Sequence, residues 1–111
     1  MIRVRYRPGP GRHSFVMAGH ADYAPHGEDI VCAGASGLCF ALMGWLENQR
    51  DKLPSLQIFA DPGEVVITCQ GDAAVKTAFD VTLMGLAQIA KKYPDHMTVE
   101  YMPQLAADTR N

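Results

Sequence analysis

A run of uncharged residues from Ile30 to Leu46 constrains the fold more than any other feature of the chain. The run reads IVCAGASGLCFALMGWL, with Asp29 before it and Glu47 after it. It is shorter than the about 20 apolar residues that a membrane-spanning helix usually needs, and glycines interrupt it. We therefore predict a helix of a soluble fold. Because this helix is apolar nearly all round, we expect it to lie in the centre of the fold.

The composition is that of one small globular domain. The chain has 111 residues, of which 48% are hydrophobic and 20% are charged, and its formal net charge is −2. Such a charge gives no global attraction to nucleic acid. The cysteines number three, and the opening MIRVRYR lacks the apolar segment of a signal peptide. We expect a single domain over residues 1–111, located in the cytoplasm and without a disulfide framework.

Alternation in the first segment and turn residues between the later ones predict five strands. Residues 2–7 alternate strictly between apolar and arginine side chains, which is typical of a half-buried strand. A PGPG turn at 8–11 separates them from a second strand at about 13–19. Two further strands, at about 56–60 and 64–70, flank the turn DPGE, and a last strand is predicted at 97–102.

Two aspartates predict where two helices begin. Asp29 can cap a helix that runs through about Gln49, and Asp72 can cap a second helix. The second helix is amphipathic and ends near Tyr93, because Pro94 cannot continue it. Its periodic apolar residues are Val75, Phe79, Leu83, Leu86 and Ala90. The order ββαββαβ predicts an α+β sandwich, in which two helices pack on one mostly antiparallel sheet.

The segment GHADYAPHGEDIVCAGAS, residues 19–36, carries the candidate chemistry. Cys32 falls in the first turn of the predicted helix, where unpaired backbone N–H groups favour a thiolate over a thiol. His20, near the end of the second strand, is a possible base for this thiol. The amides around Ala33 and Gly34 are candidates for stabilising an oxyanion. Gly34 also has no side chain to block a substrate backbone.

Nearby residues admit more than one role. Asp29 can act as a helix cap, as an orienting group in the site, or as both. Ser36 lies one turn after Cys32 on the same helix face, so its hydroxyl can hydrogen-bond in the site or bond back to a helix carbonyl. Cys39 and Cys69 lie in apolar surroundings, and we assign both to the core.

This segment closely resembles the signature of the ribosomal-processing cysteine protease family, called Prp. The family pattern is G-H-A, a short loop, and then G-x-D-I-V-C-A-x-x-S. The resemblance is nearly continuous over about 18 residues, and no key position departs from the pattern. The matching positions are Gly19, His20, Ala21, Gly27, Asp29, Ile30, Val31, Cys32, Ala33 and Ser36.

The resemblance implies an activity and a site. Members of this family are small bacterial enzymes that remove an N-terminal extension from a large-subunit ribosomal protein, number twenty-seven. By motif match, Cys32 is expected to be the nucleophile and His20 the general base, with Asp29 and Ser36 in supporting roles. The resemblance also implies a homodimer, a loop that moves over the peptide substrate, and no need for a metal or cofactor. Neither a membrane nor direct nucleic-acid binding is expected.

Two other function classes stay open. A metal site could draw on several side chains, although their spacing has no C-x-x-C or H-x-x-x-H character. The possible ligands are His20, His26, Cys32 and Cys39. A non-catalytic ribosome- or RNA-associated module could use a basic strand face, although no aromatic residues are interleaved there for base stacking. The basic residues are Arg3, Arg5, Arg7 and Arg12.

A few other side chains have no decisive pattern. An apolar stripe on the second helix is expected in the core, but part of it can instead form a dimer face. The stripe comprises Phe79, Leu83, Met84 and Leu86. Trp45 fits either place. His13 and His96 have no patterned neighbours, and we assign no role to them.

Overall fold

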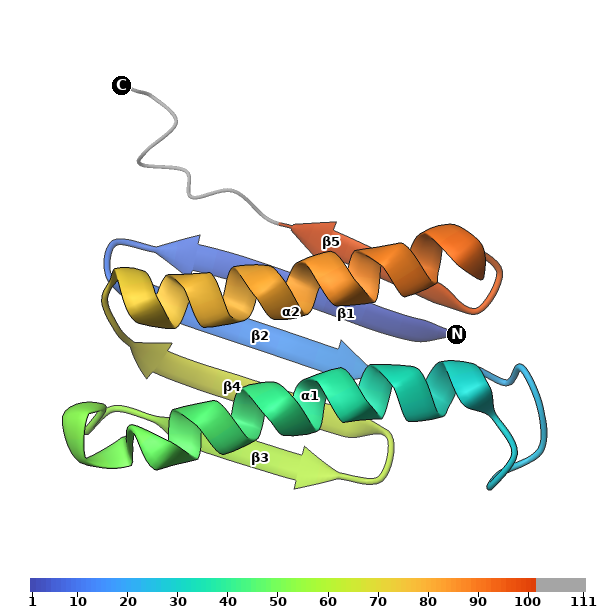
Figure 1. Ribbon diagram of the computed structural model, residues 1–111, viewed down its shortest axis with the longest axis horizontal. Coiled ribbons are helices and arrows are strands. Elements are labelled where there is room, and N and C mark those ends of the chain that lie inside the picture. The colour runs from blue at the N-terminus through green and yellow to red at the C-terminus, as the bar shows by residue number, and fades with distance from the viewer. Residues whose placement is uncertain (102–111) are drawn as a thin grey trace.

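The computed structural model describes residues 1–101 of the chain, so Met102, the predicted end of the last strand, lies outside the described residues. The strands are β1 (Ile2–Gly9), β2 (Arg12–Ala18), β3 (Gln57–Asp61), β4 (Glu64–Gln70) and β5 (Met97–Tyr101). The helices are α1 (Ile30–Asn48), the short 3-10 helix η1 (Arg50–Lys52) and α2 (Ala73–Lys92). Both long helices cover the same face of one sheet (Figure 1). The predicted α+β fold is confirmed.

The sheet has five strands in the order β3-β4-β2-β1-β5. Neighbouring strands are antiparallel except for β1 and β5, which are parallel. Along β1 the apolar side chains are buried toward the helices and the alternating arginines are exposed, as the alternation predicts. Within residues 1–101, no helix covers the opposite face of the sheet (Figure 1).

The core lies between the sheet and the two helices. From α2 it receives Val75, Phe79, Leu83 and Leu86, so the predicted amphipathic face is confirmed. Met84 is 67% exposed, and the prediction that it belongs to the core is wrong. Each residue along a helix turns by about 100°, so the residue after buried Leu83 points away from the sheet.

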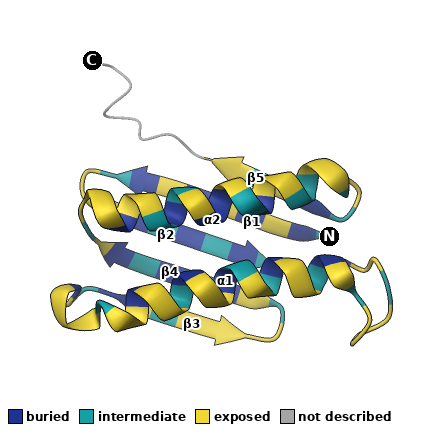
Figure 2. Ribbon diagram, viewed as in Figure 1, coloured by how far each residue is buried: buried dark blue, intermediate teal, exposed yellow. Residues whose placement is uncertain are grey.

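The prediction that α1 lies in the centre of the fold is wrong. One stripe of α1 is buried, whereas its outer side is exposed to solvent (Figure 2). The buried residues are Val31, Ala35, Cys39, Leu42 and Leu46. The exposed side carries the small residues Ala33, Gly37, Ala41 and Gly44, together with the larger apolar side chains of Ile30, Phe40 and Trp45. Alanine and glycine read as apolar in a sequence yet lose little by facing water, so the helix covers the sheet as an outer layer.

By length and composition alone, α1 is the single helix within residues 1–101 that could cross a membrane. In this fold it packs instead against the sheet and beside α2 (Figure 1). Trp45 stays partly exposed, at 36%, next to the start of α2.

Candidate active site

Three chain segments meet at one end of the sheet and form the candidate site. Strand β2 ends there, α1 begins there, and the turn between β3 and β4 lies beside them (Figure 1). A pocket of about 440 Å³ opens at this end. Its lining includes His20, Asp29, Cys32, Ala33 and Ser36. The fold therefore brings together five of the six site residues that the sequence predicted.

A second pocket, of about 410 Å³, continues from the first one. The two share His20, His26, Cys32 and Ser36, and we call them together the groove. The second part runs between α1 and the β3–β4 turn, and its lining is largely apolar. The apolar side chains include Met17, Cys39, Phe40, Met43 and Val65. Phe40 and Met43 follow Ser36 at helical spacing, and this signal could have identified them from the sequence.

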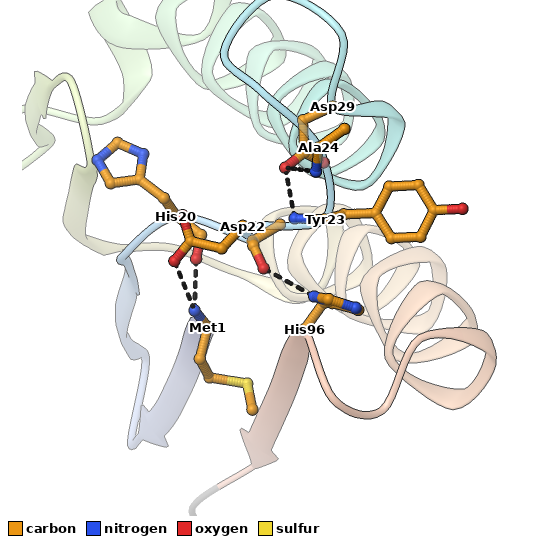
Figure 3. Close-up of polar contacts among 8 residues, drawn as sticks. Met1, His20, Asp22, Tyr23, Ala24, Asp29 and His96 are labelled. Carbon is orange, nitrogen blue, oxygen red and sulfur yellow. Dashed lines mark hydrogen bonds and ion pairs between the residues drawn. The ribbon is translucent and has the colours of Figure 1, made fainter.

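Asp29 links the start of α1 to the loop that precedes it. One carboxylate oxygen accepts a hydrogen bond from the backbone N–H of Cys32 at 2.9 Å, so the predicted role as N-cap is confirmed. The other oxygen accepts from Tyr23 N at 2.9 Å and from Ala24 N at 3.3 Å (Figure 3). Desolvation acts to raise the pKa of Asp29, but these backbone donors outweigh it and lower the pKa below its usual value.

The candidate oxyanion amides lie in different surroundings. The N–H of Ala33 donates to the backbone carbonyl of Asp29 at 3.0 Å, which is the first hydrogen bond of the helix. Gly34 does not line the groove; a Cβ at this position would lie 3.3 Å from Cδ1 of Ile89 on α2. The role of both amides stays a prediction, and Ala33 would have to share its N–H between the Asp29 carbonyl and an oxyanion.

His20 is exposed, and its backbone is held by contacts that the sequence did not reveal. The amino group of Met1 donates to the His20 carbonyl at 2.5 Å and lies 3.7 Å from the carboxylate of Asp22. His96 donates from Nδ1 to the carbonyl of Ala21 at 2.9 Å (Figure 3). His96 lies 75 residues away from Ala21 in the chain. No local pattern could therefore have linked them.

Aromatic rings hold the first half of the loop against the end of α2. The Tyr23 ring meets the rings of Tyr93 and His96 edge-on, with centroids 5.2 Å and 5.3 Å apart. The His20 ring points away from this cluster (Figure 3). The loop is thus fixed at Tyr23, while His26 and Gly27 are exposed at the groove.

The three cysteines are free thiols in unlike surroundings. Cys39 and Cys69 are buried, so their assignment to the core is confirmed. Burial raises the pKa of Cys39 to about 11 and also raises the pKa of Cys69. Cys32 is partly exposed on the wall of the groove. Within residues 1–101, no three or more His, Cys, Asp or Glu side chains cluster as a metal ion would need.

The chain is similar to proteases that process ribosomal proteins. A family model described as "Cysteine protease Prp" matches residues 1–98. The ribosomal processing cysteine protease Prp of Mycoplasma pneumoniae is 35% identical over 94 residues, which cover 79% of this chain and 86% of that protein. The protein with the same description from Bacillus subtilis is 29% identical over 102 residues, or 86% of this chain and 91% of the relative.

Solved structures also show similarity to a ribosomal processing protease. The ribosomal processing protease Prp from S. aureus, in complex with a covalently linked product peptide, superposes with a TM-score of 0.80 at 26% identity. That match covers 91% of this chain and 99% of the S. aureus chain. A second structure of the S. aureus protease, in complex with a substrate peptide, superposes with a TM-score of 0.70 at 25% identity and the same coverage.

Proposed function

The chain belongs to the Prp family of cysteine proteases, and from this membership we propose its substrate and its catalytic residues. The proposed substrate is the N-terminal extension of a bacterial large-subunit ribosomal protein, number twenty-seven. Cleavage of that extension, during ribosome maturation in the cytoplasm, exposes the mature N-terminus. The groove beside Cys32 supports this assignment, because it joins two neighbouring pockets, one of them largely apolar, and so suits a bound peptide.

The proposed catalytic residues are Cys32 and His20. His20 takes the proton of the thiol, and the thiolate of Cys32 attacks the carbon of the scissile carbonyl. The C–N bond then breaks as His20 returns its proton to the leaving amine, which leaves a thioester on Cys32. A water molecule, deprotonated by His20, attacks this thioester and releases the new carboxyl end and the free thiol.

The observation that carries this proposal is the shared groove. His20 comes from the end of β2 and Cys32 from the start of α1, yet both line the two parts of the groove. Asp29 supports the arrangement from outside the reaction, because its carboxylate ties the amide of Cys32 to the loop that follows His20. Ser36 lines the same wall one turn further along α1, and we propose that its hydroxyl contacts the bound peptide.

The test uses a peptide that spans the extension junction of the ribosomal protein. We expect Cys32→Ala and His20→Ala to lower kcat/KM by about a thousandfold or more, because each removes a group that acts in bond breaking. The matched control is Cys69→Ala, which removes a buried thiol remote from the groove and should keep cleavage. Equal cleavage by the Cys32→Ala protein would refute the assignment.

We also propose that the chain forms a homodimer through the outer surface of its helices. Val81 and Met84 are 62% and 67% exposed on α2 and present apolar area that a second copy could cover. Light scattering should give the mass of two chains, and Met84→Lys should shift the protein toward the monomer. A monomer at high concentration of the unaltered protein would contradict this.

A further inference from the structure

The turn between β3 and β4 contacts the segment of His20 through a single glycine, Gly63. The carbonyl of Gly63 accepts a hydrogen bond from the backbone N–H of Gly19 at 2.9 Å. Gly63 has a φ of +87°, which residues with a side chain rarely adopt. The same residue thus closes a hairpin and holds the backbone immediately before His20.

The imidazole of His20 also lies directly against Gly63. A Cβ at position 63 would be 3.0 Å from Nε2 and 3.3 Å from Cε1 of His20. Unstrained non-bonded contacts of carbon lie at about 3.5–4.0 Å, so any side chain at position 63 would push the ring aside. Gly63, His20 and Cys32 line the same part of the groove. A displaced ring therefore changes its position relative to the thiol.

We propose that Gly63 is a positioning residue for the protease reaction: its bare Cα sets where the His20 imidazole rests on the wall of the groove. This inference rests on the proposed role of His20 as general base. A base must come within about 2.6–3.2 Å of the atom whose proton it transfers. A Cβ at position 63 would force the ring to shift by a few tenths of an ångström, so the turn sets this distance through its contact with the imidazole of His20.

The chain offers a matched control at the other end of the sheet. Gly11, in the turn between β1 and β2, has a φ of +65°, and a Cβ there would meet nothing within 4 Å. Gly11→Ala therefore imposes backbone strain of the same kind as Gly63→Ala without any contact with His20. A third variant, Gly63→Asn, keeps the Cβ but eases the strain, because asparagine tolerates positive φ better than alanine.

The first measurement is kcat and KM on the junction peptide, together with urea unfolding of each variant. We expect Gly63→Ala and Gly63→Asn to lower kcat about ten- to a hundredfold with a smaller change in KM, because a misplaced base slows the chemical steps. Gly11→Ala should keep the original kcat. The inference is overturned if the Gly63 variants keep kcat, or if Gly11→Ala loses as much as they do.

The second measurement is the rate at which iodoacetamide alkylates Cys32, which requires no peptide substrate. We expect Gly63→Ala to slow alkylation when His20 is present and to change it less than about twofold in the His20→Ala background. An undiminished effect without His20, or alkylation that does not depend on His20, overturns the inference. If the unaltered protein leaves the junction peptide intact while alkylation depends on both residues, the proposed substrate fails and the positioning role stands.

Discussion

The two ends of strand β2 each carry a histidine, and the two side chains have opposite surroundings. His13, near the start of β2, is 5% exposed, shares a hydrogen bond of 2.7 Å between its Nδ1 and the Tyr6 hydroxyl, and stacks on Phe79 with ring centroids 5.1 Å apart. His20, just beyond the other end, is exposed on the wall of the groove. Burial lowers the pKa of His13 and so favours its neutral form.

The difference shows that two histidines on one strand can have surroundings that suit different roles. A histidine stacked among aromatic rings contributes to packing, and burial lowers its pKa and so makes it a weaker base. His20 is held through its backbone, by Met1 at its own carbonyl and by Gly63 at the preceding amide, so its ring stays accessible. The fold thus fixes the main chain at the candidate site and leaves the ring of the proposed base open to the groove.

The largest test of this contrast replaces each histidine with glutamine. We expect His20→Gln to lower kcat/KM by about a hundred- to ten-thousandfold, which is the usual contribution of a general base to the reaction rate. His13→Gln should instead cost about 1–3 kcal/mol of unfolding free energy, because Tyr6 is 0% exposed and its hydroxyl loses its hydrogen bond to the His13 ring. Peptide cleavage and urea denaturation of both variants provide the two readouts.

The contrast fails if the two effects exchange places. A His13→Gln protein that folds with its original stability but cleaves poorly would connect the core to the chemistry. Likewise, a large loss of stability in His20→Gln would show that the exposed ring supports the fold.

A smaller test compares the aspartates that cap the two helices. Asp72 accepts from the backbone N–H groups of Ala74 and Val75 at the start of α2, near His13, and Asp29 caps α1 beside Cys32. Replacing either cap by alanine should cost about 1 kcal/mol of unfolding free energy. Only Asp29→Ala should also slow cleavage, roughly tenfold, because it releases the loop at Tyr23. If Asp72→Ala slowed cleavage to a similar degree, the slowing would come from loss of helix stability in general and not from release of the loop.

Most of the fold was predictable because its signals are local. The alternation of residues 2–7, the DPGE turn and the two capping aspartates each act within a few residues, and the structure confirms all of them. The position of α1 was not predictable in the same way. Its outer face carries alanine and glycine beside exposed Ile30, Phe40 and Trp45, and this apolar character does not tell an inner helix from an outer one.

The candidate site was predictable only where it is contiguous in the chain. The segment of residues 19–36 contains His20, Asp29 and Cys32, and the groove brings these three together. The contacts of His96 with Ala21 and of Gly63 with His20 join residues that are far apart in sequence. Such contacts depend on how the strands and helices pack, which no local pattern contains.

The smallest effect concerns how protonation of His13 changes stability. Its pKa is lowered in the folded protein by burial and lies near 6.5 in the unfolded chain. As the pH falls through 6.5, the unfolded chain takes up a proton that the folded protein resists, so the unfolding free energy decreases. Between pH 7 and pH 6 the decrease from this one group is at most about 0.7 kcal/mol. Urea unfolding at both pH values should show this decrease in the unaltered protein and should not show it in His13→Gln. If both proteins respond to pH equally, His13 titrates as freely as an exposed histidine, and the contrast between the two ends of β2 does not extend to their protons.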